Sequence, residues 1–73
     1  MTPRLYLLFR STHETLKAEA LLQGAGIACR VVQKPSAIRM DCGLALRTSP
    51  TVQQEALGAL RGAGLEPRGV FEV

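Results

Sequence analysis

Short apolar runs, separated by polar and glycine-containing stretches, follow one another along the chain. The first run, LYLLFR, combines leucines with a tyrosine and a phenylalanine, which is typical of a strand in the centre of a sheet. IACRVV and GLALR are two further runs, and a short one lies near the C-terminal end. The pattern therefore predicts four strands, at residues 5–10, 27–32, 43–47 and 67–73.

A first helix is predicted between the first two strands. Ser11, with Glu14 three residues later, forms a capping box, the signature of a helix N-terminus. The glycines at 24 and 26 permit a left-handed cap that would end the helix. The face of this helix that turns to the core is expected to hold Leu16, Ala20 and Leu21.

A second helix is predicted after the third strand. Ser49 is its expected N-cap, and Pro50 takes the first helical position, where the missing N–H is no loss. Gly62 to Gly64 would end it. Its inner face is expected to hold Val52, Ala56, Leu57 and Leu60.

The two halves of the sequence repeat each other when the chain is shifted by 38 positions. Gly24-Ala25-Gly26 then falls on Gly62-Ala63-Gly64. Equivalent single positions include Ser11 and Ser49, Ala18 and Ala56, and Leu22 and Leu60. Two copies of one supersecondary unit explain this match better than chance. We therefore expect a single domain, residues 1–73, built as a pseudo-repeat of 1–36 and 39–73.

Each repeat is predicted to be a strand-helix-strand unit. A right-handed crossover leaves the two strands of a unit parallel, and two interleaved units give a four-stranded antiparallel sheet in the order 4-1-3-2. The expected fold class is α+β, a ferredoxin-like βαββαβ sandwich with both helices on one face. Because Leu5 to Phe9 are apolar at odd and even positions, we expect the open face to be partly covered, for example in a homo-oligomer formed through the sheet.

Composition and charge restrict the class of protein. The 73 residues, 47% of them hydrophobic, suffice for one core but not for separate catalytic and binding domains. No cleavage-site pattern follows the N-terminal segment, and no stretch approaches the roughly 18 apolar residues of a membrane span. We expect a cytoplasmic protein with reduced cysteines and no membrane partner. The net charge of +3 comes with scattered arginines rather than a basic run, so a nucleic-acid partner is not expected.

Cys42 is the candidate for chemistry, since it precedes Gly43 and the third predicted strand in the stretch MDCGLALR. Strands one and three are antiparallel neighbours in the predicted sheet. If Leu7 faces its repeat equivalent Ala45, Cys42 lies across from Arg10.

The residues after Arg10 would make the first turn of the first helix: Ser11, Thr12 and His13. Unpaired N–H groups and the positive end of the helix dipole favour an anion there. A thiol beside such a turn has a lowered pKa, because its thiolate is the stabilised form.

Cys29 is expected to serve packing. It should face about residue 46, roughly four residues or about 13 Å along the sheet from Cys42. The α-carbons of a disulfide must approach within about 7 Å, so no disulfide is expected. The loop 33–41 between the halves would either fold over the Cys42 thiol or be a plain hairpin loop whose Ile38 and Met40 cover the core edge.

The chain resembles the small selenium/sulfur carrier-like proteins, a family formerly described only as a domain of unknown function. The most specific element is a Cys-Gly pair followed by a hydrophobic residue and alanine, here Cys42 to Ala45. The other matching positions are Phe9 to Thr12, Leu16 to Glu19, Gly26-Ile27, Pro35 and Ile38. The loop departs from the pattern, with Gln33 in place of the usual proline and Ser36-Ala37 in place of a common Arg-Glu pair.

The resemblance implies a thiol carrier rather than an enzyme. Such a carrier holds sulfur or selenium as a persulfide or perselenide, taken from a protein donor and passed to a protein acceptor. The implied carrier thiol is Cys42. From the predicted strand pairing and the first turn of the helix, the binding residues expected around it are Gly43, Arg10, Ser11, Thr12 and His13. No cofactor and no metal are expected.

Other functions of this fold have weaker support in the sequence. An RNA-recognition module needs aromatic residues on the third strand, where CGLAL offers leucines. A metal chaperone needs Cys-x-x-Cys in the first loop, where FRSTHET holds one histidine. No carboxylate pair, Ser/His/Asp set or Gly-rich phosphate loop supports turnover. The serious rival is an ACT-like interaction or small-ligand-binding domain in which Cys42 only packs.

Overall fold

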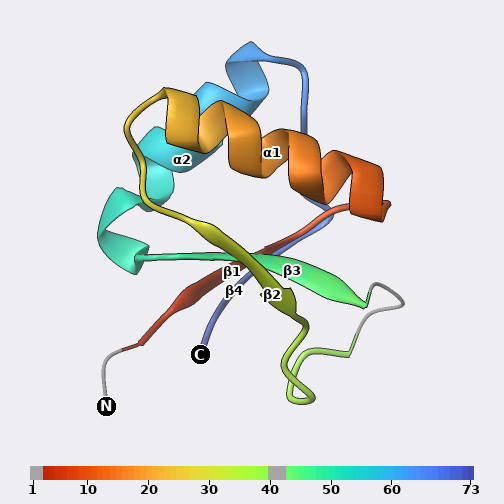
Figure 1. Cartoon of the computed structure of the whole chain (residues 1–73). Coiled ribbons are helices and arrows are strands. Elements are labelled where there is room, and N and C mark those ends of the chain that lie inside the picture. Colours follow the sequence, from red (N-terminus) through yellow and green to blue (C-terminus); the bar gives the residue numbers. More distant parts are fainter. Residues whose placement is uncertain (1–2, 40–42) are drawn as a thin grey trace.

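The chain forms a four-stranded antiparallel sheet with both helices packed on one face, as Figure 1 shows for a computed structural model that describes residues 3–39 and 43–73. The elements in chain order are β1 (Leu5–Leu8), α1 (Thr12–Gly24), β2 (Arg30–Gln33), β3 (Leu44–Thr48), the 3-10 helix η1 (Pro50–Val52), α2 (Gln53–Gly62) and β4 (Gly69–Glu72). The strand order is β2-β3-β1-β4, which reads 4-1-3-2 from the opposite edge. β1 and β3 are thus the central strands.

The register between β1 and β3 differs by one residue from the predicted one. Leu7 pairs with Leu46, not with its repeat equivalent Ala45. Leu7 and Leu46 are both fully buried under the helices, whereas Ala45 belongs to a separate cluster on the other face. Since directly paired residues share a face, burial of both leucines fixes this register. The approximate two-fold axis that relates the two halves of the chain therefore passes between two neighbouring residue pairs of β1 and β3, and not through a single pair.

The register between β2 and β3 also corrects the predicted place of Cys29. Val31 pairs with Leu46, and Arg30 pairs with Arg47. The Thr48 hydroxyl donates a 2.8 Å hydrogen bond to the carbonyl oxygen of Ala28, which extends the contact beyond the strand. Cys29 therefore lies beside Thr48, two residues further along β3 than predicted. β2 starts three residues later than expected because the end of α1 engages Ile27, whose N–H donates to Leu22.

The buried face of α1 also differs from the prediction. Leu16 is 51% exposed and Ala20 is exposed, while Leu21 is partly buried and packs against the core as predicted. The buried residues of the helix are Thr15, Ala18 and Leu22. Thr15 can be buried because its hydroxyl donates a 3.0 Å hydrogen bond to the carbonyl oxygen of Ser11. A polar residue thus occupies the side of the helix that faces the core. The prediction counted only apolar residues and therefore chose another side.

Both helices end in the same way, 38 residues apart. Gly26 and Gly64 have positive φ values of 80° and 76°. The N–H of Ile27 donates a hydrogen bond to the carbonyl oxygen of Leu22. The N–H of Leu65 donates one to the carbonyl oxygen of Leu60 in the same way. Glycine adopts the left-handed conformation without steric cost, so these positions suit it. The caps place two further equivalent residues, Ile27 and Leu65, in the core beneath the helices.

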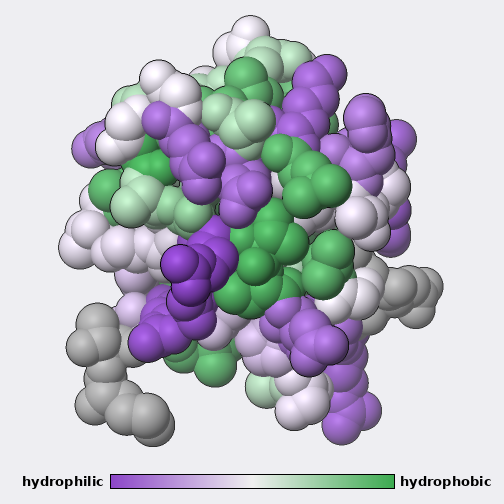
Figure 2. Space-filling model, viewed as in Figure 1, coloured by the Kyte–Doolittle hydropathy of each residue, from purple (hydrophilic) through white to green (hydrophobic). Residues whose placement is uncertain are grey.

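The sheet face away from the helices is partly covered by the loop after β2. Ile38 is 2% exposed and packs with Leu8 and Ala45, and Tyr6, Val32 and Phe71 lie around this cluster. Two hydrogen bonds of Lys34 hold the loop. Its backbone N–H donates to the carbonyl oxygen of Gly43, and its ammonium group donates to the carbonyl oxygen of Ile38. This cover comes from within the chain. Figure 2 shows a further apolar area between α1 and the edge strand β2, framed by hydrophilic residues.

Candidate functional site

The first turn of α1 is one half of the predicted site. Ser11 has an extended backbone, and its side-chain oxygen accepts a 3.2 Å hydrogen bond from the N–H of Glu14. The N–H of Thr15 already bonds to the carbonyl oxygen of Ser11. Within residues 3–39 and 43–73, the N–H groups of Thr12 and His13 have no hydrogen-bond acceptor. These two donors, at the positive end of the helix dipole, can bind an anion.

Gly43 is the nearest described residue to the predicted carrier thiol, because Cys42 lies outside the described residues. Gly43 is exposed, accepts a hydrogen bond from the N–H of Lys34 and leads directly into β3. If the observed pairing of β1 and β3 is continued, Gly43 lies across from Arg10. The start of β3 and the start of α1 therefore lie at the same end of the sheet, as Figure 1 shows.

The charges around the α1 N-terminus are mixed. Arg10, Ser11, Thr12 and His13 are all exposed. Arg10 lines a hollow of about 170 Å³ together with Glu14, Gly64, Leu65 and Glu66. The positive charge of Arg10 and the helix dipole favour an anion, whereas the two carboxylates in the same hollow oppose one. Accessible hydrogen-bond donors and Arg10 are thus brought together at this end, with Glu14 and Glu66 limiting the positive potential.

Cys29 is a half-buried thiol that faces α1. Its Sγ lies 3.7 Å from the carbonyl oxygen of Glu19, to which it donates a hydrogen bond. Burial, and secondly the negative charge of Glu19, raise the pKa of this thiol above its ordinary value. A thiol of this kind is a poor nucleophile at neutral pH. The packing role predicted for Cys29 agrees with these contacts.

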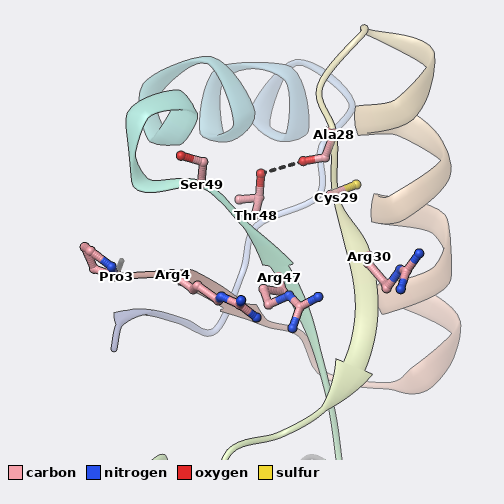
Figure 3. Close-up of a pocket in the computed structure, with 8 residues that line it drawn as sticks. All are labelled: Pro3, Arg4, Ala28, Cys29, Arg30, Arg47, Thr48 and Ser49. Carbon is pink, nitrogen blue, oxygen red and sulfur yellow. Dashed lines mark hydrogen bonds between the residues drawn. The ribbon is translucent and has the colours of Figure 1, made fainter. Parts of the chain in front are cut away.

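A pocket at the other end of the sheet did not emerge from the sequence. It has a volume of about 450 Å³ and is lined by Pro3, Arg4, Ala28, Cys29, Arg30, Arg47, Thr48 and Ser49 (Figure 3). Its three arginines come from three different strands or strand starts, so only the sheet register brings them together. In the sequence these arginines stand next to apolar strand residues. That pattern is common in strands and does not indicate a pocket.

The described residues contain no group of three or more His, Cys, Asp or Glu side chains close enough to share an ion. His13, considered for such a role, is a single exposed residue in the first turn of α1. Neither helix in the described ranges has the length and apolar character needed to cross a bilayer.

Comparison with known proteins gives one match. No curated protein and no solved structure is significantly similar to the chain. A family model described as "Putative Se/S carrier protein-like" matches residues 4–72, which is nearly the whole chain and includes the sheet, both helices and the Cys-Gly pair. The chain therefore belongs to this selenium/sulfur carrier-like family.

Proposed function

We propose that this protein carries sulfur or selenium on the thiol of Cys42, within a ferredoxin-like βαββαβ domain. The observation that carries the proposal is the family match over residues 4–72, which spans Cys42 and Gly43. The protein is a relay between a donor and an acceptor protein and performs no turnover of its own. Its place of action is the cytoplasm, where thiols stay reduced.

The carrier step is an exchange between sulfur atoms. The Cys42 thiolate attacks the terminal sulfur of a persulfide on the donor, R–S–SH. A new S–S bond forms on Cys42, the S–S bond of the donor breaks, and the donor leaves as R–S⁻. A nucleophile on the acceptor then attacks the terminal sulfur and releases the Cys42 thiolate. Each step conserves electrons, and a perselenide follows the same scheme with selenium as the terminal atom.

The first turn of α1 supports this chemistry by offering donors to an anion. The N–H groups of Thr12 and His13 lack acceptors among the described residues, and Arg10 adds a positive charge. These groups lie at the same end of the sheet as Gly43, the residue bonded to Cys42. Both the attacking thiolate and the persulfide anion would be stabilised there.

The position of Cys29 supports a carrier that keeps its cargo. A second thiol near a persulfide would attack it and discharge the sulfur as a disulfide. Cys29 lies beside Thr48, whereas Gly43 lies beside Lys34 at the other end of β2. The five residue steps from position 29 to position 34, which flank the two ends of β2, correspond to about 17 Å of strand. We therefore expect Cys29 to stay reduced while Cys42 is loaded.

Mass spectrometry tests the proposal directly. The protein is incubated with a cysteine desulfurase and cysteine, and the intact mass is measured without reductant. We expect a gain of one sulfur atom in the wild type and in Cys29→Ser, and no gain in Cys42→Ser. Peptide mapping should place the added sulfur on Cys42.

The thiol pKa of Cys42 provides a second test, from alkylation rates against pH in the Cys29→Ser background. We expect a value below the roughly 8.5 of a model thiol, raised by Arg10→Gln and unchanged by Arg4→Gln, which removes a charge at the opposite end of the sheet. A value at or above 8.5, or no added sulfur on Cys42 with an active desulfurase, would contradict the carrier and favour the interaction-domain alternative.

A further inference from the structure

The pocket lined by Arg4, Arg30 and Arg47 lies at the end of the sheet opposite Gly43. It is separated from the α1 N-terminus by the length of the strands (Figure 1). An inference about this pocket therefore goes beyond the proposed carrier function and does not rest on it.

Two of the arginines form a direct cross-strand pair. Arg30 on β2 and Arg47 on β3 are α-carbon partners, and Arg47 also pairs with Tyr6 on β1. Arg4 precedes Tyr6 by two residues and so lies on the same face, diagonal to Arg47. Like charges directly opposite each other destabilise a sheet. The charges of this pair therefore do not stabilise the sheet.

No acidic side chain lines the pocket with the three arginines. The other lining residues are Pro3, Ala28, Cys29, Thr48 and Ser49, none of which carries a carboxylate. Across the described parts of the chain, Arg4, Arg30 and Arg47 take part in no ion pair. Figure 3 shows the side chain of Arg4 extending toward Arg47 and that of Arg47 extending in the same direction, while the side chain of Arg30 points outward from β2, away from both. The concentrated positive charge is therefore available to a ligand.

The pocket has the size of a small-ligand site. Its volume of about 450 Å³ falls within the roughly 300–1,000 Å³ of known ligand pockets. Guanidinium groups bind phosphate oxygens in bidentate geometry, and each contact is a charge-assisted hydrogen bond. We propose that Arg4, Arg30 and Arg47 bind the phosphate chain of a small ligand, such as the di- or triphosphate group of a nucleotide.

The same face is less suited to single-stranded nucleic acid. Such strands stack their bases on exposed aromatic rings. The two aromatic residues of this face, Tyr6 and Phe71, are half-buried against the cluster around Ile38, and neither lines the pocket. The three arginines without an exposed aromatic ring beside them favour a small phosphate-bearing molecule.

Calorimetric titration of the full-length protein with tripolyphosphate tests the site. At physiological ionic strength, where diffuse attraction is screened, we expect saturable one-to-one binding. Arg47→Gln should weaken it about tenfold or more, because a charge-assisted hydrogen-bond pair is lost. Arg47→Lys, which keeps the charge but not the planar fork, should fall between Arg47→Gln and the wild type. Circular dichroism checks that each variant is folded.

Arg61→Gln is the matched control, since it removes the same charge outside the pocket. It should change the affinity less than about twofold. In NMR spectra, tripolyphosphate should shift the amide signals of Arg30, Thr48 and Ser49 and leave those of Thr12 and His13 in place. The NMR shifts distinguish binding in the pocket from binding at the α1 N-terminus. The pocket proposal can therefore be wrong while the carrier proposal still holds.

Three results would overturn the phosphate pocket. The first is an absence of saturable binding, and the second is an equal loss of affinity in Arg47→Gln and Arg61→Gln. The third is tighter binding of single-stranded RNA than of tripolyphosphate, increasing with RNA length and lost in Tyr6→Ala. That last outcome would identify the open sheet face as a nucleic-acid surface instead.

Discussion

Glu19 on α1 accepts a 3.0 Å hydrogen bond from the backbone N–H of Val31 on the edge strand β2. An edge strand has N–H groups without a partner strand, which invite pairing with another chain. The Glu19 carboxylate satisfies one of these groups from within the molecule. The backbone carbonyl of the same residue accepts from the Cys29 thiol. Glu19 thus joins α1 to the edge of the sheet at two points.

Removing the Glu19 carboxylate should therefore destabilise the protein. We expect Glu19→Ala to lower the free energy of unfolding by about 1–3 kcal/mol, because a hydrogen bond to a charged group is lost. Glu19→Gln keeps an acceptor oxygen and should cost less. Urea denaturation measures both, with Glu55→Gln, an exposed carboxylate on α2, as control within about 0.5 kcal/mol of the wild type. Equal values for Glu19→Ala and Glu55→Gln would contradict the bond to Val31.

The same carboxylate should control the Cys29 thiol. Burial and the Glu19 charge raise the pKa of Cys29, so Glu19→Gln should lower that pKa and speed alkylation of Cys29 at a given pH. The Cys42→Ser variant leaves Cys29 as the only thiol for this measurement. Stability is linked to it: the folded state holds the proton more tightly than the unfolded state, so unfolding becomes easier as the pH rises through the folded pKa of the thiol. Cys29→Ala should lack this alkaline loss.

The internal repeat explains which parts of the fold were accessible from sequence. Helix ends, the N-cap at Ser11 and the number of strands follow from local signals, such as the repeated Gly26 and Gly64. Ser49 caps the 3-10 helix η1 rather than α2, whose N-cap is Val52, so the predicted start of the second helix was wrong by three residues. The register of β1 against β3 does not follow from local signals, because it depends on which side chains share the core. Leu7 and Leu46 decide it by their common burial, and no local rule distinguishes this pairing from one shifted by a residue.

The candidate site was predictable only in part for the same reason. The N-cap at Ser11 comes from a four-residue pattern, and the structure has it. The arginine pocket needs residues 4, 30 and 47 to meet across three strands, which requires the correct register. The buried face of α1 was wrong because Thr15, a polar residue, takes a core position after bonding its hydroxyl to Ser11.

Glycine-to-alanine exchanges should separate backbone strain from helix propensity. Gly26→Ala and Gly64→Ala each force a side chain into the left-handed region, with φ values of 80° and 76°, and should cost about 1–2 kcal/mol of unfolding free energy. Gly58→Ala lies inside α2 with open space around the new methyl group and should stabilise by about 0.5–1 kcal/mol. Thermal melts of the three variants measure this. A neutral result at both caps would contradict the shared cap geometry.

Leucine truncations should test the corrected face of α1. Leu22 and Leu60 are repeat equivalents and are both fully buried, so Leu22→Ala and Leu60→Ala should each cost about 2–5 kcal/mol. Because a domain of this size has only about 4–11 kcal/mol in total, either variant should be close to unfolding. Leu16→Ala, on the exposed side of α1, should stay within about 0.5 kcal/mol of the wild type. A large loss in Leu16→Ala would restore the face expected from the sequence.

Ile38 should be the main contributor to the cover over the open sheet face. It is 2% exposed and packs on Leu8 and Ala45, so Ile38→Ala should lower the free energy of unfolding by about 2 kcal/mol or more. It should also expose apolar strand residues, which a hydrophobic dye such as ANS would detect in the folded protein. Ser36→Ala, an exposed position of the same loop, is the matched control. If Ile38→Ala matched Ser36→Ala in stability and dye binding, the loop would not cover the sheet, and the face would be free for a partner.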